Sequence, residues 1–140
     1  MKILVSACLL GKPCRYDGRS KPCMRVIELS QKADTELIEV CPEELGGLPT
    51  PREPSEILGN KVISKDGRDV TEFFERGAKK ALAIARENSC SYAILKSLSP
   101  SCSPSCVYDG SFSGKVVDGM GVTARILKEN GITVLSEEEI

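Results

Sequence analysis

Lys2-Ile3-Leu4-Val5-Ser6-Ala7-Cys8 is a short apolar run that leads directly into a cysteine. The consecutive aliphatic residues, followed by a loop around Gly11, predict a buried strand over residues 2–6. Residues 36–41 and 92–96 are similar runs, and each also ends at or just before a cysteine-bearing loop. We therefore expect three strands of one kind, each with cysteine at or beyond its carboxyl end.

The remaining periodic segments alternate with these strands. They predict helices over about residues 22–33, 69–88 and 121–129. They also predict a small edge strand or hairpin over 61–64 and a strand over 132–135. A long loop is expected before residue 121, and a tail over 136–140. Asp69 with Glu72 fits a capping box at the start of the second helix, and Gly131 fits a left-handed helix end. Alternating strands and helices predict a Rossmann-like α/β fold, with a parallel sheet covered by helices, in a single domain over residues 1–140.

Composition narrows the chemistry. The chain has 140 residues, a formal net charge of -1, seven cysteines and no histidine. The near-neutral charge gives no basic field for DNA, and no apolar run reaches the roughly 20 residues of a membrane span. No signal-peptide pattern is present, so we expect a cytoplasmic protein. In that compartment many cysteines indicate metal or redox chemistry rather than disulfides.

Three cysteines occupy equivalent places in the predicted sheet. Cys8 follows the first strand, Cys41 ends the second and Cys102 follows the third. Parallel strands place their carboxyl ends along one edge, where ligand sites form, so we expect these three side chains to converge. The other cysteines are two that share the same loops, Cys14 and Cys106, and two that we interpret as small buried apolar residues, Cys23 and Cys90.

A site built only from thiolates favours zinc, Cu(I) or an iron–sulfur cluster over magnesium or calcium. Structural zinc sites usually contain two close cysteine pairs, and here only Cys102 and Cys106 resemble one. The spacing does not match a ferredoxin run either. The pattern therefore predicts a metal site and leaves the metal open.

The segments around these cysteines resemble those of the thiouracil desulfidase family. The resemblance covers essentially the whole chain and is carried by Ser6-Ala7-Cys8-Leu9-Leu10-Gly11, Arg15-Tyr16-Asp17-Gly18, Cys41-Pro42-Glu43, residues 46–52 (GGLPTPR), residues 96–102 (KSLSPSC), Phe112-Ser113-Gly114 and residues 119–124 (GMGVTA). Ser103 departs from the pattern, because glycine is expected after Cys102, and Cys106 is unusual. Both departures lie in a loop on the substrate side.

The resemblance implies a [4Fe-4S] cluster held by Cys8, Cys41 and Cys102, with the fourth iron free of protein ligands. It also implies an enzyme that replaces the sulfur of a thiolated pyrimidine base, or of a related small thiocarbonyl compound, with oxygen and releases sulfide. An iron with an open position is a soft Lewis acid, which suits capture of a thiocarbonyl sulfur.

Such a reaction also requires proton transfer, for which we predict two catalytic residues. Glu43 is the acid/base candidate, because burial beside a cluster raises a carboxyl pKa; its structural alternative is a cap on the following turn. Ser99 is placed facing the cluster by the resemblance. The predicted substrate-binding residues are Ser101, Arg15 and Asp17, although Ser101 also suits a local turn and Asp17-Gly18 is foremost a turn signal.

Arg52, between Pro51 and Glu53, suits an anion or carboxylate, but we expect a solvated loop arginine. Two other functions fit the sequence. One is a non-catalytic module in which cysteines hold a structural zinc ion. The other is a thiol–disulfide or sulfur-carrier protein that uses Cys102 and Cys106.

Overall fold

The four predicted strands form one parallel sheet in the computed structural model, which describes residues 1–140. They are β1 (Lys2–Ser6), β2 (Glu36–Val40), β5 (Tyr92–Leu95) and β8 (Thr133–Ser136), arranged in the order β2-β1-β5-β8. All three pairings are parallel. The predicted α/β architecture is confirmed, and the strand bounds differ from the predicted ones by one residue at most.

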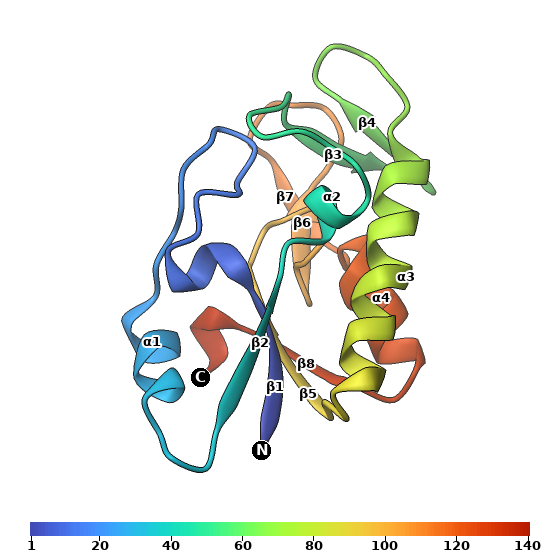
Figure 1. Cartoon of the computed structure of the whole chain (residues 1–140). Coiled ribbons are helices and arrows are strands. Elements are labelled where there is room, and N and C mark those ends of the chain that lie inside the picture. Colours follow the sequence, from blue (N-terminus) through green and yellow to red (C-terminus); the bar gives the residue numbers. More distant parts are fainter.

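Helices cover both faces of the sheet (Figure 1). On one face, α3 (Thr71–Glu87) and α4 (Val122–Glu129) pack on an apolar cluster that includes Leu4, Leu95 and Leu127. On the other face, α1 (Met24–Ser30) packs on a second cluster with Ile3 and Val5. Because successive side chains of a strand point to opposite faces, β1 supplies both clusters and lies at the centre of the core.

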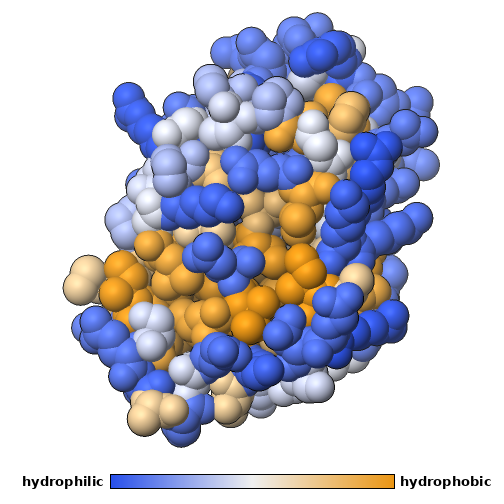
Figure 2. All heavy atoms as spheres, viewed as in Figure 1, coloured by the Kyte–Doolittle hydropathy of each residue, from blue (hydrophilic) through white to orange (hydrophobic).

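The edge strand β2 is only partly covered. Apolar side chains gather on the surface around it, in the region between α1 and α3 (Figure 2). Leu37 packs against the core cluster on one face of the sheet and Ile38 against the cluster on the other. Glu36 and Glu39 are exposed on the same strand, and such charges discourage pairing of a free edge with another chain.

Two hairpins lie beyond the carboxyl ends of the sheet strands (Figure 1). The first consists of β3 (Ser55–Leu58) and β4 (Lys61–Ser64), and the second of β6 (Cys106–Tyr108) and β7 (Val116–Asp118). The second hairpin occupies the segment that we predicted as a loop. The buried Glu56 joins the two, since its Oε1 accepts hydrogen bonds from the N–H groups of Gly110 at 3.0 Å and Phe112 at 3.1 Å.

Two predicted details at element ends are wrong. The capping box of Asp69 and Glu72 does not form, because Val70 occupies the N-cap of α3. Asp69 instead accepts hydrogen bonds from the N–H of Thr71 at 3.0 Å and from its hydroxyl at 2.6 Å. The segment predicted as a tail contains a 3-10 helix, η2 (Glu137–Glu139), which has its own capping box with Ser136. No helix of the structure is long and apolar enough to cross a membrane.

The short helix α2 (Pro42–Leu45) follows β2 and lies against α3 with almost no space between the two backbones. A Cβ atom added to Gly77 of α3 would lie 1.9 Å from the carbonyl oxygen of Pro42. One added to Gly46 would lie 1.9 Å from the carbonyl oxygen of Phe73. These two glycines therefore set the position of α2 and of the residues beside it.

We predict that Gly77→Ala lowers the free energy of unfolding by about 1–3 kcal/mol, the usual cost of overpacking. In an open helix the same change would stabilise by about 0.5–1 kcal/mol. Urea unfolding followed by circular dichroism measures the effect. Ala83→Ser also adds one heavy atom to α3, but on an exposed position, and serves as the control. A stabilised Gly77→Ala variant would contradict the close approach of the two backbones.

Candidate metal centre

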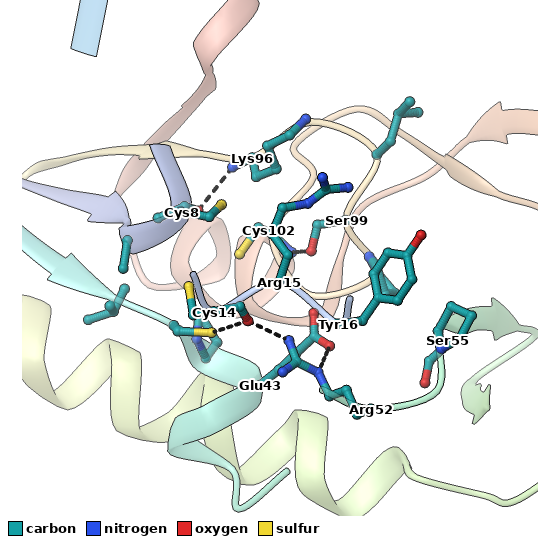
Figure 3. Close-up of a pocket in the computed structure, with 18 of the residues that line it drawn as sticks. Cys8, Cys14, Arg15, Tyr16, Glu43, Arg52, Ser55, Lys96, Ser99 and Cys102 are labelled. Carbon is teal, nitrogen blue, oxygen red and sulfur yellow. Dashed lines mark hydrogen bonds and ion pairs between the residues drawn. The ribbon is translucent and has the colours of Figure 1, made fainter. Parts of the chain in front are cut away.

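A cavity of about 160 Å³ opens at the carboxyl ends of β1, β2 and β5. The chain leaves β1 towards β2 on one side and later places β5 on the other side of β1. The loops after β1 and β5 therefore separate at this point, which is where parallel α/β sheets form their ligand sites. Figure 3 shows the side chains that line the cavity.

The structure brings the three predicted cysteine ligands together. Cys8 lies in η1 (Ala7–Leu10), the 3-10 helix that follows β1, and is 7% exposed. Cys41 is the residue between β2 and α2, and Cys102 lies in the loop after β5 and is 5% exposed. All three line the cavity. Their convergence follows from the parallel sheet, because each comes from the carboxyl end of a different strand.

A fourth thiol, Cys14, lies in the same cavity and is buried. Its carbonyl oxygen lies 3.6 Å from Sγ of Cys41, which donates to it. Contact with the Cys41 thiol lowers the pKa of Cys14, but contact with Cys8 and burial outweigh this effect and raise that pKa to about 11. Cys106, by contrast, lies on β6 and does not line the cavity.

The donor set fits an iron–sulfur cluster. Burial raises the pKa of Cys102 to about 12, and contact with Cys14 together with burial raises the pKa of Cys41 further. Thiolates in this cavity therefore require a compensating positive centre, which a metal site provides. Although the Cys14 thiol contacts those of Cys8 and Cys41, no group of three cysteine or acidic side chains has the geometry of a site for a single ion. A zinc site needs four ligands at about 2.0–2.3 Å from one ion, whereas a [4Fe-4S] cluster distributes its thiolates over different irons.

Glu43 lies in α2, two residues after Cys41, and lines the cavity. Its Oε1 accepts a hydrogen bond at 3.0 Å from Nε of Arg52, whose side chain is only 6% exposed. The expectation of a solvated Arg52 is therefore wrong, because the ion pair and the burial of its stem hold it inside. Burial raises the pKa of Glu43, and the charge and hydrogen bond of Arg52 offset part of that rise.

The two predicted serines differ in position. Ser99 lines the cavity, and its Oγ accepts hydrogen bonds from the N–H groups of Ser101 at 3.2 Å and Cys102 at 3.0 Å. Its hydroxyl lies beside the Cys102 thiol, and this contact offsets part of the rise that burial causes in the pKa of Cys102. Ser101 is fully buried behind the loop, where its hydroxyl pairs with that of Thr123 at 2.8 Å. Ser101 thus stabilises the loop and is not among the residues that line the cavity.

Arg15 and Asp17 are also separated. Arg15 lines the cavity, its side chain makes no ion pair, and its guanidinium carbon lies 5.8 Å from the centre of the Tyr16 ring, which also lines the cavity (Figure 3). Asp17 is exposed, accepts a hydrogen bond from the N–H of Arg19 at 3.0 Å and does not line the cavity. The turn interpretation of Asp17 is the one that matches its contacts.

Lys96 is a cavity residue that the sequence interpretation did not select. Its Nζ lies 2.8 Å from Oε2 of Glu137 in η2 and donates to the carbonyl and hydroxyl oxygens of Ser97, each at 3.1 Å. All three ammonium protons are therefore used within the protein. In the sequence, Lys96 could have been identified as a candidate because it is a charged residue directly after the apolar run of β5.

The fold and the site define a Rossmann-like α/β protein with a cysteine-lined centre at the carboxyl ends of its strands. Residues 3–139 match the 2-thiouracil desulfurase family, and the chain belongs to this family. The resemblance recognised in the sequence is thereby confirmed.

Two relatives illustrate the match. YbbK of Bacillus subtilis (strain 168) is 44% identical over 148 residues, which cover 99% of this chain and 97% of that protein. The solved structure of TudS, described as a [4Fe-4S]-dependent thiouracil desulfidase, is 43% identical and superposes with a TM-score of 0.91, covering 99% of this chain and 92% of that one. The likeness extends over the whole sheet and all the cavity loops.

The ion pair of Lys96 and Glu137 makes stability depend on pH. Burial alone would raise the pKa of Glu137, but the hydrogen bonds from Lys96 and from the N–H of Ser97 outweigh it and lower that pKa. A carboxyl with a lowered pKa stabilises the fold above its unfolded pKa, about 4.3, and this contribution is lost as the pH falls through the folded value.

We therefore expect Glu137→Gln to unfold more easily at pH 7 and to lose less stability than the wild type between pH 5 and pH 3. Urea unfolding at several pH values measures this. Glu138→Gln, in the same 3-10 helix but without an ion pair, is the control. Parallel acid profiles for wild type and Glu137→Gln would refute the contribution of this pair.

Proposed function

We propose that this protein is a [4Fe-4S]-dependent desulfidase that converts the C=S group of a thiolated pyrimidine base, such as thiouracil, to C=O and releases hydrogen sulfide. The observation that carries the proposal is the convergence of Cys8, Cys41 and Cys102 from three strand ends on one cavity that also contains Glu43 and Ser99. Membership of the 2-thiouracil desulfurase family and the similarity to TudS support it. We further propose that residues 1–140 act as one catalytic domain in the cytoplasm on a small-molecule substrate.

When bound by these three cysteines, the cluster supplies a thiophilic, Lewis-acidic iron without a protein ligand. The ligands are thiolates from three different loops. Cys8 and Cys102 are buried, at 7% and 5% exposed, and Cys41 is partly buried, which limits the access of bulk water to the proposed ligands.

Glu43 is the proposed base for the attacking water. Its Oε1 is held by Arg52, while Oε2 makes no hydrogen bond within the protein, and the residue lines the cavity. Oε2 accepts a proton as the water oxygen bonds to the ring carbon and the C–S bond breaks. That proton and the one left on the water oxygen both pass to the departing sulfur as the C=O bond forms, so that C=S and water give C=O and hydrogen sulfide.

Ser99 and Arg15 are the proposed groups that orient the substrate. Two backbone N–H groups already occupy the acceptor side of Ser99 Oγ, so this hydroxyl donates a hydrogen bond to the heterocycle. The unpaired guanidinium of Arg15 donates to an oxygen on the ring edge, and the neighbouring Tyr16 offers an aromatic face. Ser101 and Asp17 lie outside the cavity, and the proposal gives them no contact with substrate.

The first test is anaerobic purification with measurement of the visible spectrum, iron, acid-labile sulfide and zinc. We expect about four iron and four sulfide per chain, a brown colour and release of sulfide from 2-thiouracil. Cys8→Ala, Cys41→Ala and Cys102→Ala should each lose most of the iron. Cys106→Ala is the matched control, since it removes a cysteine near Cys102 that does not line the cavity.

Cys14→Ala should retain its iron, because the three proposed ligands remain. Iron loss in this variant would require a different ligand set. A colourless wild-type protein with stoichiometric zinc, even after anaerobic reconstitution with iron and sulfide, would exclude the catalytic cluster and favour the structural zinc module.

Glu43→Gln should lower kcat for 2-thiouracil by about 10²–10⁴-fold, the usual contribution of a general base. Glutamine retains a side-chain oxygen for Arg52, so the iron content and KM should change little. Glu44→Gln, the next residue of α2, is the comparison variant because Glu44 does not line the cavity. Near-normal kcat in Glu43→Gln would assign the proton transfer to another group.

A further inference from the structure

We infer that Arg52 is a positioning residue that orients two functional side chains at once. It binds Glu43 directly, and it orients Arg15 by holding the backbone on either side of that residue. This inference rests on the proposed function of the site. Arg52 lies on the segment that follows α2, and its side chain is almost completely buried between the cavity loops (Figure 3).

The guanidinium group of Arg52 binds three segments. Nε donates to Oε1 of Glu43 at 3.0 Å, and Nη2 donates to the carbonyl oxygen of Cys14 at 3.0 Å. Nη1 donates to Oγ1 of Thr50 at 2.8 Å and to the carbonyl oxygen of Pro49 at 3.2 Å. All three nitrogens are thus engaged, in the planar fork geometry that distinguishes arginine from lysine.

The backbone of Arg52 adds a contact that the side chain does not make. Its N–H donates to the carbonyl oxygen of Tyr16 at 2.7 Å. Residue 52 therefore holds the carbonyl groups of both Cys14 and Tyr16, the two residues that flank Arg15. Arg15 is fixed from its other side as well, because its N–H donates to the carbonyl of Arg19 at 3.1 Å and its own carbonyl accepts from Gly18 at 2.9 Å.

In this arrangement, one functional group of Glu43 and one of Arg15 remain without a hydrogen bond inside the protein and are available to a ligand. Oε2 of Glu43 and the guanidinium of Arg15 have no hydrogen-bond partner in the protein, while the atoms behind them are held by Arg52. The buried cation of Arg52 therefore fixes the position of the proposed base, Glu43, relative to the proposed substrate-binding group, Arg15. Misplacement of reacting groups by about 1 Å costs on the order of 10²-fold in rate, so this spacing is a determinant of catalysis.

The substitution Arg52→Lys tests the inference. Lysine keeps the charge and the backbone N–H, but its single nitrogen cannot bind Glu43 and the Cys14 carbonyl in the same fork. We expect kcat to fall and KM for 2-thiouracil to rise, each about 10-fold, so that kcat/KM falls about 100-fold. Iron content should stay near the wild-type value and the variant should remain folded, although the lost buried hydrogen bonds lower its melting temperature. Arg68→Lys, at an exposed arginine paired only with Asp66, is the control and should have wild-type kinetics.

Two double-mutant cycles separate the two actions of Arg52. In a Glu43→Gln background, Arg52→Lys should still raise KM but lower kcat little further. In an Arg15→Ala background, it should still lower kcat but raise KM little further. Additive effects in both cycles would overturn the inference, because they would mean that Arg52 acts through neither residue.

A binding measurement keeps the test independent of turnover. Calorimetric titration of 2-thiouracil should show that Arg52→Lys weakens binding about as much as Arg15→Ala does. A wild type that binds 2-thiouracil but releases no sulfide would contradict the proposed function while leaving the binding role of Arg52 measurable. If both Arg52→Lys and Arg52→Gln lose iron or fail to fold, Arg52 is a structural residue and the inference is overturned.

Discussion

Parallel pairing on both sides of β1 is the constraint on which the site depends. Val5 of β1 pairs with Glu39 of β2 and with Ile94 of β5, so the three strands end at nearly the same level. Three loops that are distant in the sequence consequently begin side by side. A shift of one pair by a single residue would turn the side chains of that strand to opposite faces. The core and the metal centre thus depend on the same register.

Two of the three positively charged side chains that line the cavity are held in buried ion pairs. Arg52 is paired with Glu43, and Lys96 with Glu137, with side chains between 6% and 16% exposed in both pairs. Such pairs fix geometry more than they add stability, because desolvation offsets much of their attraction. Arg15 alone keeps an unpaired positive charge at the cavity. The paired residues hold the walls in place, and the unpaired one is free to meet a ligand.

Much of the fold could be predicted from the sequence because the buried strands are continuous aliphatic runs and the helices are amphipathic. The convergence of Cys8, Cys41 and Cys102 followed from topology alone. Strands β6 and β7 could not be predicted in this way, since three residues are too few to show a period, and the loop between them is held by Glu56 from the other hairpin.

The orientation of side chains within irregular loops also could not be predicted from the sequence. Ser99 and Ser101 flank the same proline, yet one faces the cavity and the other Thr123. The segments that start at Cys14 and at Cys106 have similar sequences, but only Cys14 lines the cavity. Arg52 lies in a proline-rich stretch that looks solvated, and its partners come from α2 and from the loop after β1. Neighbouring residues do not encode such contacts.

The order in which the chain is made gives the sheet topology a consequence for biogenesis. Cys8 is translated early, whereas the loop of Cys102 is anchored by β5, which pairs with the late strand β8. A ribosome-bound chain that lacks β8 leaves one side of β5 unpaired. All three proposed cysteine ligands are thus translated before the strand that completes the sheet beside the Cys102 loop, and the wall of the cavity that β5 supports is finished last.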